Sequence, residues 1–256
     1  MTSCHPAIAP NQPQFIIGYG SLMNAASKQE TVPDSSDSIP IRVRGFERGW
    51  FYQSQDSDFE PIDSELTTYL GVVENPAATI NAVLFRLLGH PQADIDKLDE
   101  REHGYCRQQV HPAQIIRLDR SPIPLAGEIW IYVVKSIHPP SASHPIVQSY
   151  VDLTLNGCLE LETAYRLNTN HRHDFTAEYI QTTSHWSSHW LDDRQSPRRP
   201  SSQLLPFATI DQLLSIVTPT HQYWQMRCPD EETNLVPQPV PGNISKIWVG
   251  STNIST

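Results

Sequence analysis

The sequence predicts a mixed α+β protein whose first half forms a curled or closed sheet. Short runs with the alternating or β-branched composition of strands fill most of the first 135 residues. These runs surround one short helix rather than alternating strictly with helices, which argues against a doubly wound sheet. After Pro139 and Pro140 the pattern changes to the wider apolar spacing of helices.

Each expected strand has a local signature. The first is a short apolar run that a turn at Tyr19-Gly20-Ser21 closes. The second contains Gly45 and Gly49, which predicts a bulge or bend. A turn at Asn75-Pro76 separates the third from the fourth. We expect strands at residues 15–18, 39–52, 69–73, 80–88, 108–110, 114–118 and 128–134.

The expected helices are marked by apolar spacing and by capping residues. Ile95 and Leu98 lie three residues apart. Gly157 is a residue type that favours a helix C-cap, and Thr209 with Gln212 matches a capping box. We expect helices at residues 22–29, 91–102, 146–156, 159–167, 175–190 and 209–217.

Composition along the chain predicts four segments. Residues 1–13 are polar and contain proline, so we expect a poorly ordered lead-in. Residues 14–158 form the main domain, residues 159–228 a helical extension packed on it, and residues 229–256 a Pro-rich polar tail. The acidic, polar segment 53–65 is a candidate lid.

Charge and hydropathy exclude two classes of partner. The chain has 18 Lys and Arg against 28 Asp and Glu, a formal net charge of −10. This balance argues against binding to nucleic acid or to anionic membranes, because both need a basic face. The longest apolar run, near residues 129–134, is far shorter than the roughly 20 residues of a membrane span. The first residues lack the basic and apolar regions of a signal peptide, so we expect a cytoplasmic protein.

The cysteines agree with that location. Cys4, Cys106, Cys158 and Cys228 are far apart and form no Cys-x-x-Cys pair. We therefore expect free thiols in a reducing compartment.

Two segments carry residues suited to chemistry, and the first is the turn from Gly18 to Leu22. It leaves a buried strand and enters a helix. Such a turn exposes successive backbone N–H groups, which bind a carboxylate or a developing oxyanion. The same glycines are also typical of an ordinary strand–turn–helix joint.

The second segment is the end of the helix expected at residues 91–102. Ile95, Leu98 and Glu102 share one helical face, whereas Asp99 and Glu100 are expected to point toward water. An inward-facing carboxylate must be hydrogen-bonded, or it must accept a proton with a raised pKa. The alternative is a helix-end Glu that reaches solvent or pairs with Arg101 or Arg107.

Together the two segments resemble the γ-glutamylcyclotransferase superfamily, including its AIG2-like and ChaC-like branches. The motifs are Phe-Ile-Ile-Gly-Tyr-Gly-Ser-Leu at residues 15–22 and Leu-Asp-Glu-Arg-Glu-His-Gly-Tyr-Cys-Arg at residues 98–107. Pro145, Tyr150 and Gly157 match a third element of the family. The resemblance covers residues 14–157.

The resemblance implies a fold and a set of roles. The fold is a small closed or nearly closed β-barrel with flanking helices. Glu102 matches the acid/base carboxylate of the family, and Tyr105 and Tyr150 match tyrosines near its pocket. The residues that match the turn binding the γ-glutamyl group, mainly through backbone amides, are Tyr19, Gly20, Ser21 and Leu22. About a hundred further residues follow the resembling part, which indicates an elaborated branch.

The implied reaction needs no covalent nucleophile, metal or cofactor. A γ-glutamyl amide carries its own nucleophile, the α-amine, which closes a five-membered ring on the γ-carbonyl. The protein must hold the chain folded back, move protons and stabilise an oxyanion. We expect Glu102 to move both protons and the amides of Gly20 and Ser21 to hold oxygens, with a small γ-glutamyl compound as substrate.

Three alternatives compete with this hypothesis. The first is a metal site, formed by the helical i, i+4 pair His185 and His189 with His171, His173 and Asp174. The second is a thiol nucleophile at Cys106, although a lone Cys is more often a small core residue. The third is a barrel that binds a γ-glutamyl or peptide ligand without turnover, because fold does not determine function.

Overall fold

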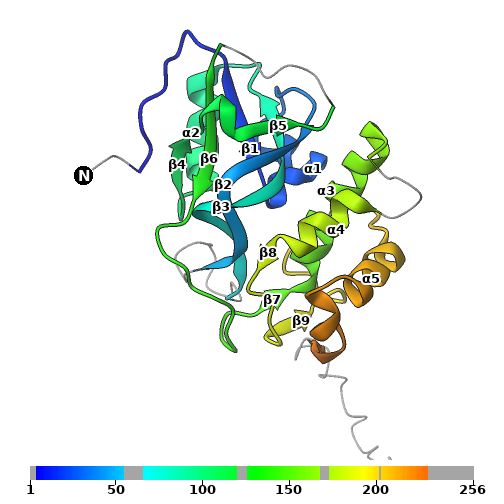
Figure 1. The fold of residues 1–256 in the computed structure, drawn as a ribbon. Coiled ribbons are helices and arrows are strands. Elements are labelled where there is room, and N and C mark those ends of the chain that lie inside the picture. Colours follow the sequence, from blue (N-terminus) through cyan, green and yellow to red (C-terminus); the bar gives the residue numbers. More distant parts are fainter. Residues whose placement is uncertain (1–3, 55–65, 120–125, 168–172, 202, 230–256) are drawn as a thin grey trace, which may run out of the picture.

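The computed structural model describes residues 4–54, 66–119, 126–167, 173–201 and 203–229. Within them the protein is an α+β fold, with a mixed sheet and helices on its sides (Figure 1). Helices α3 (Gln148–Tyr165), α4 (Asp174–Gln181) and α5 (Phe207–Ile216) are grouped at one side of the sheet, and α2 (Pro91–Arg101) lies at another. The candidate lid from residue 55 onward, His171 and the tail from residue 230 onward lie outside the described residues.

Seven strands form the main sheet, in the order β4-β6-β1-β3-β2-β5 with β8 paired to β2. The pairs β1–β6 and β2–β8 are parallel and the other pairs are antiparallel. Among the described residues no pairing joins the edge strands β4 and β5, so the expected closure into a barrel is not found there. The strands are β1 (Gln14–Gly18), β2 (Ile39–Gln53), β3 (Thr68–Arg86), β4 (Cys106–Gln109), β5 (Ile115–Arg117), β6 (Glu128–Val133) and β8 (Thr183–Ser184).

The long pair β2–β3 corrects one expectation. The turn predicted at Asn75-Pro76 is a bulge within β3 rather than a break between two strands. Arg44 pairs with Thr79 and Phe46 pairs with Glu74, so residues 75–78 stand opposite Gly45 alone. Gly45 has a φ of +87°, which glycine adopts readily. The bulge accommodates a proline that has no N–H to donate to the ladder.

A small second sheet belongs to the C-terminal part of the chain. Its three strands pair in parallel in the order β10-β9-β7. They are β7 (Ile146–Val147), β9 (Trp190–Asp192) and β10 (Cys228–Pro229).

The helices differ from expectation mainly where tertiary contacts decide their ends. In the described part of the chain the α-helices are α1 (Ala25–Thr31), α2 (Pro91–Arg101), α3 (Gln148–Tyr165), α4 (Asp174–Gln181) and α5 (Phe207–Ile216). Short 3-10 turns are η1 (Ser21–Met23), η3 (Pro112–Gln114), η4 (Thr220–Gln222) and η5 (Trp224–Met226). The helix expected at residues 22–29 is interrupted at Asn24, whose side chain accepts from Ser27 N at 3.0 Å and caps α1.

Gly157 does not end a helix, because α3 runs through it. A Cβ atom on Gly157 would lie 2.6 Å from Asn24 N and from the carbonyl carbon of Met23. The glycine therefore lets α3 pack directly against the turn after β1. The helix ends instead at Arg166, in the left-handed region with a φ of 52°.

The helix expected at residues 175–190 is also shorter, because α4 ends at Gln181 and β8 and β9 follow. The buried guanidinium of Arg48 donates to Tyr179 O and Thr182 Oγ1, both at 2.8 Å, and to Thr183 Oγ1 at 2.8 Å. These bonds hold the end of α4 against β2, where Thr183 then pairs with Arg48.

The N-terminal segment is tied to the sheet edge. Cys4 and Cys106 form a disulfide bond, so the expected free thiols are found only at Cys158 and Cys228 among the described cysteines. Arg107 N donates to Cys4 O at 2.9 Å, which aligns the segment with β4. Ile8 is buried, so residues 4–13, expected as a poorly ordered lead-in, have defined contacts.

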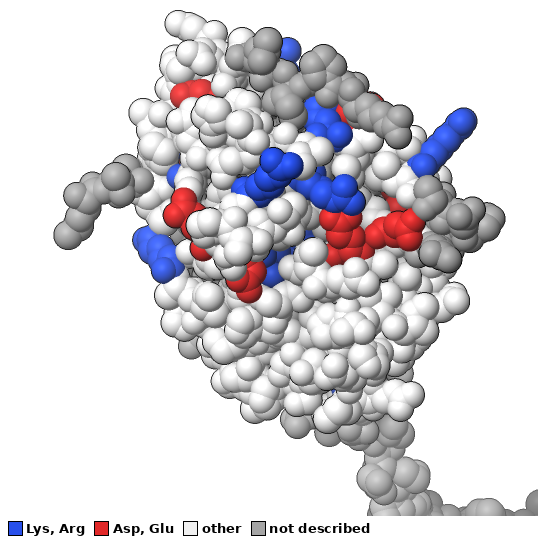
Figure 2. Space-filling model, viewed as in Figure 1, with Lys and Arg blue, Asp and Glu red and all other residues white. Residues whose placement is uncertain are grey.

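The surface seen in Figure 2 carries basic and acidic side chains next to one another across its upper and middle part, and few charges below. In the portion of the chain that the structure describes, no helix is long and apolar enough to cross a membrane.

Candidate active site

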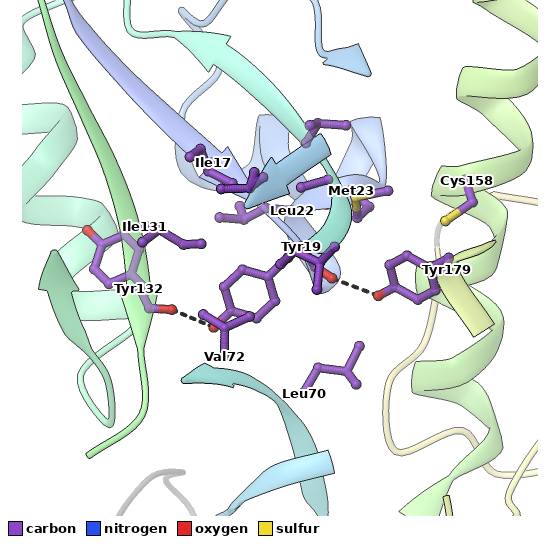
Figure 3. Close-up of a cluster of buried hydrophobic side chains, with 14 of the residues drawn as sticks. Ile17, Tyr19, Leu22, Met23, Leu70, Val72, Ile131, Tyr132, Cys158 and Tyr179 are labelled. Carbon is purple, nitrogen blue, oxygen red and sulfur yellow. Dashed lines mark hydrogen bonds between the residues drawn. The ribbon is translucent and has the colours of Figure 1, made fainter. Parts of the chain in front are cut away.

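The turn after β1 is held from two sides (Figure 3). The hydroxyl of Tyr19 donates to Tyr132 O in β6 at 2.7 Å, and the carbonyl of Tyr19 accepts from the hydroxyl of Tyr179 in α4 at 2.7 Å. The side chains of Tyr19 and Tyr179 are almost fully buried. Burial raises the pKa of Tyr19 well above its ordinary value, so its hydroxyl stays protonated as a donor.

Gly20 leaves room for a tyrosine beside this turn. A Cβ atom at Gly20 would lie 2.8 Å from the hydroxyl oxygen of Tyr150, which comes from the first turn of α3. Among the described residues the Tyr150 hydroxyl has no hydrogen-bond partner, and it faces the turn. It therefore offers a donor at the position where the turn amides lie.

Glu102 lies opposite the turn, directly after α2. Ile95 and Leu98 on the same face of α2 are fully buried, and the Glu102 side chain is 15% exposed. Burial raises the pKa of the Glu102 carboxyl above its ordinary value, and the nearby Arg101, His103 and Arg199 offset part of this rise. The carboxyl thus binds a proton more readily than that of an ordinary Glu.

Arg101 connects the carboxylate to the turn. Its Nε lies 3.4 Å from Glu102 Oε1, and its Nη2 donates to Ser21 Oγ at 2.9 Å. It also donates to Ser27 O at 2.8 Å and to Thr31 Oγ1. The pairing considered for Glu102 is therefore with Arg101, and it leaves the carboxylate beside Ser21.

Asp99 corrects a second expectation from the helix pattern. It does not point to water, since it accepts from the hydroxyl of Tyr132 at 2.6 Å and from Arg107 Nε at 3.0 Å. Arg107 also lies over the ring of Trp130. The tertiary packing of β4 and β6 against α2 provides these partners, and Arg107 is consequently engaged with Asp99 rather than with Glu102.

The structure brings all the sequence-predicted site residues together. A small recess is lined by both the turn and the tyrosines around Glu102. Its volume is about 30 Å³, and it shares Ser21, Glu102, Tyr105 and Tyr150 with a cleft of about 620 Å³. The predicted residues that line the recess are Tyr19, Gly20, Ser21, Leu22, Glu102, Tyr105 and Tyr150.

The two flanking tyrosines differ in their freedom. The hydroxyl of Tyr105 donates to Leu70 O at 2.9 Å, and its ring packs against Tyr52 with the ring centroids 4.7 Å apart. Tyr105 therefore forms a wall of the recess, whereas the Tyr150 hydroxyl is open to a ligand.

Several residues that line the cleft were not predicted from the sequence. Tyr52 and Tyr69 come from β2 and β3, and Arg199 comes from a loop after β9. Arg101, expected as an ion-pair partner of Glu102, also lines the cleft. No spacing rule relates these positions along the chain, so the signal that finds them is three-dimensional.

The metal alternative does not fit the observed backbone. His185 has a φ of 61° and lies after α4 with His189, so the two do not share a helix face, and both are exposed. The imidazole Nδ1 of His173 lies 2.6 Å from Glu162 Oε2. Within the described ranges no group of three His, Cys, Asp or Glu residues is arranged to hold a metal.

The thiol alternative is wrong, because the sulfur of Cys106 is bonded to Cys4. A disulfide sulfur has no thiolate to attack a carbonyl.

Comparison with protein-family models and with curated proteins finds no sequence match. Solved structures do match. One is a "Gamma-glutamyl cyclotransferase", 12% identical, covering 60% of this chain and 84% of its own, with a TM-score of 0.43.

Two further matches widen the group. A yeast γ-glutamyl cyclotransferase described as specific to glutathione is 14% identical, covers 66% of this chain and 96% of its own, and has a TM-score of 0.40. A human protein described as uncharacterized is 12% identical, covers 68% and 90%, and has a TM-score of 0.46. These identities and scores are low, so we base the function on the residues of the recess.

Proposed function

We propose that the protein is a γ-glutamylcyclotransferase-type enzyme that cyclises a γ-glutamyl amide to 5-oxoproline and releases the free amine. The observation that carries the proposal is the position of Glu102. Its carboxyl, with a raised pKa, faces the Gly20-Ser21 turn across a small recess. A module that only binds its ligand has little use for a costly buried carboxylate at this position.

Glu102 performs the proton transfers in this proposal. Its carboxylate accepts a proton from the α-ammonium group of the substrate, and the freed amine attacks the γ-carbonyl carbon. The new C–N bond closes the ring and leaves a tetrahedral intermediate with an oxyanion and a protonated ring nitrogen. The protonated Glu102 gives its proton to the departing nitrogen as the original amide bond breaks and the oxyanion collapses to the lactam carbonyl. The ring nitrogen passes its second proton to the released amine, so the lactam is neutral and the Glu102 carboxylate is restored.

The turn and Tyr150 stabilise the charge that develops. Gly20, Ser21 and Tyr150 line the same recess, so the backbone N–H groups of the turn and the Tyr150 hydroxyl are suited to hold the oxyanion or the substrate carboxylate. Burial raises the pKa of Tyr150, which keeps it a donor at neutral pH. Arg101 positions both sides of the recess, because it contacts Ser21 and Glu102 at once.

The proposed reaction requires no cofactor, since the substrate supplies the nucleophile and Glu102 supplies the base. Holding the γ-glutamyl chain folded back makes the attack intramolecular, which lowers the entropic cost of reaching the transition state.

A 5-oxoproline assay with γ-glutamyl-L-alanine, glutathione and a γ-glutamylamine tests the proposal. We expect wild-type protein to release 5-oxoproline from at least one of them, and Glu102→Gln to lower kcat by about 10²–10⁴-fold. Asp96→Asn is the control, because Asp96 is an exposed carboxylate of α2 that lines neither the cleft nor the recess.

Binding measurements separate an enzyme from a binding module. The enzyme predicts that Glu102→Gln still binds γ-glutamyl-L-alanine by calorimetry while turnover collapses. Binding by wild type without 5-oxoproline from any substrate would favour the non-catalytic module. Wild-type rates in Glu102→Gln would remove Glu102 from the reaction.

A further inference from the structure

The disulfide bond between Cys4 and Cys106 lies close to the recess along the chain. Cys106 directly follows Tyr105, which forms a wall of the recess, and it stands four residues after Glu102. Both bonded cysteines are only partly buried, whereas the free Cys158 is fully buried. The bond is therefore partly accessible to a thiol from solution, and it is next to groups on which the proposed reaction depends.

Residues 4–8 lie beside β4 at the edge of the main sheet (Figure 1). The backbone N–H of Arg107 in β4 donates to Cys4 O at 2.9 Å. Farther along, Ala9 N donates to Glu128 Oε2 at 2.7 Å, so the chain from Ala9 onward has an anchor of its own. The stretch whose position depends on the disulfide is therefore residues 4–8.

The side chain of Arg107 connects this stretch to the helix that precedes Glu102. Its Nη2 donates to Pro6 O at 2.7 Å, and its Nε donates to Asp99 Oδ1 in α2 at 3.0 Å. The Arg107 side chain is only 3% exposed, so its ion pair with Asp99 is shielded from water, in part by Pro6. Loss of that cover would hydrate the guanidinium and weaken its hold on the end of α2.

A second path runs through the backbone of Tyr105. The imidazole Nε2 of His5 lies 3.1 Å from Tyr105 O, and Tyr105 N donates to Glu102 O at 2.8 Å. Tyr105 also lines the recess. Residues 4–8 are thus bonded to a residue that is both a wall of the recess and the end of the turn that carries Glu102.

We propose that the Cys4–Cys106 bond is a reversible redox site that controls the geometry of the recess. With the bond closed, residues 4–8 hold β4 and the turn at Glu102 in place. With the bond open, residues 4–8 depend on single hydrogen bonds and on the buried side chain of Ile8. Segments held in this way open locally at a low cost in free energy. The effect on turnover rests on the proposed function, whereas the release of residues 4–8 does not.

The redox step is a thiol–disulfide exchange with a dithiol. A thiolate of the dithiol attacks one sulfur of the protein bond, the S–S bond breaks, and a mixed disulfide forms. The second thiolate of the dithiol then attacks the dithiol's own sulfur in that mixed disulfide. The reductant leaves as a disulfide and the protein keeps two thiols, so two electrons and two protons pass from the reductant to the protein. An oxidised dithiol reverses the exchange.

A reversible bond also agrees with the cytoplasmic location expected from the sequence. In reducing compartments the disulfides that do form are mostly transient, and they act in catalysis or in redox sensing. The other described cysteines are free thiols, of which Cys158 is buried in α3 and Cys228 lies in the second sheet. The redox chemistry is therefore assigned to the bonded pair.

Reduction and reoxidation of wild type test the proposal, with 5-oxoproline release from γ-glutamyl-L-alanine as the readout. Dithiothreitol is the reductant and 2-hydroxyethyl disulfide the oxidant, and mass spectrometry of alkylated samples verifies the state of the bond. We expect reduction to lower kcat/KM by about 10-fold and reoxidation to restore it. This loss is smaller than that expected for Glu102→Gln, because the carboxyl itself is retained.

Two variants isolate the bond. Cys4→Ser removes it, and should show the reduced rate whether or not dithiothreitol is present. Cys228→Ser is the matched control, since it removes the exposed free thiol and keeps the bond, and it should respond as wild type does. If Cys4→Ser does not fold by circular dichroism, the reduced and reoxidised wild type decide. Equal kcat/KM in the two states, or a higher value after reduction, would overturn the proposal.

Hydrogen exchange of single amides distinguishes the redox proposal from the catalytic one. The Arg107 amide reports the release of the N-terminal residues, because it donates to Cys4 O. The Tyr105 amide reports the turn that carries Glu102. We expect both amides to exchange about 10-fold faster, or more, after reduction.

The Val134 amide is the control, since it donates to Val72 O at 3.0 Å and should keep its rate. Faster exchange at Tyr105 and Arg107 without turnover in either state would support the redox site while the catalytic proposal fails. Turnover that does not respond to reduction would support catalysis and reject the redox site. Unchanged exchange, or equal acceleration of all three amides, would also reject it.

Discussion

The hydroxyl of Tyr179 in α4 lies 2.7 Å from the carbonyl oxygen of Tyr19, in the turn that forms one side of the recess. Tyr179 itself is packed over the buried guanidinium of Arg48, whose central carbon lies 3.6 Å from the ring centroid. The part of the chain beyond the family resemblance is therefore joined to the turn through α4. It contributes to the site both by this bond and by Arg199.

Removing the Tyr179 hydroxyl should loosen the turn without emptying the core. For Tyr179→Phe we expect the free energy of unfolding to fall by about 1 kcal/mol, the typical net contribution of one hydrogen bond. We expect kcat/KM for 5-oxoproline formation to fall about 3- to 10-fold, because the turn amides lose one of their two anchors. Urea unfolding and steady-state kinetics measure the two effects.

Tyr165→Phe serves as the control, since Tyr165 ends α3 and lies outside both the recess and the cleft. A Tyr179→Phe variant with normal kinetics and reduced stability would mean that α4 supports the fold but not the turn.

Gly20 should not tolerate a methyl group. The added Cβ of Gly20→Ala would lie 2.8 Å from the Tyr150 hydroxyl, and the resulting shift should cost about 1–3 kcal/mol of stability. Thermal unfolding of Gly20→Ala, Tyr150→Phe and the double variant checks this. We expect Tyr150→Phe to recover most of the loss in the double variant; strictly additive effects would locate the cost elsewhere.

The pH dependence of kcat/KM should follow the ionisation of the Glu102 carboxyl. Catalysis uses the ionised carboxylate, so kcat/KM should fall as pH decreases through its pKa, and burial places this acid limb above the roughly 4.3 of an ordinary Glu. Arg199→Met removes a cation that lowers this pKa, and the limb should then move to higher pH. The pH profile of kcat/KM with γ-glutamyl-L-alanine measures this shift. A limb that stays in place, or moves to lower pH, would contradict it.

The disulfide should stabilise the fold. It joins residues 102 positions apart and so lowers the conformational entropy of the unfolded chain. We expect it to raise the free energy of unfolding by about 2–4 kcal/mol, as disulfides typically do. Reduction with a phosphine should therefore lower the unfolding midpoint of wild type but not that of Cys4→Ser. Equal responses of the two proteins would show that the bond does not contribute.

The same bond bears on the expected cytoplasmic location. Stable disulfides are typical of oxidising compartments. Alkylation and mass spectrometry of protein taken directly from cells would show whether Cys4 and Cys106 are bonded there; free thiols would agree with the cytoplasmic prediction.

Local patterns predicted elements well where the chain pairs with its sequence neighbours. The spacing of Ile95 and Leu98 places α2 correctly, and the glycine at position 45 predicts the bend of β2. The same rules failed at Asn75-Pro76 and at Gly157. In both places the local signal for a break is real, but long-range contacts continue the strand and the helix through it.

The sequence by itself determined the α+β class, the glycine turn and the inward-facing carboxylate, because strand alternation and helix periodicity are set by nearest neighbours. Through the family resemblance it also predicted that Tyr105 and Tyr150 lie near the pocket. Only the tertiary structure decided that Cys4 meets Cys106, that Asp99 is paired, and that Arg199 stands over Tyr69. Each of these depends on which surfaces pack together, and residues that are distant along the chain become neighbours only when the core is formed.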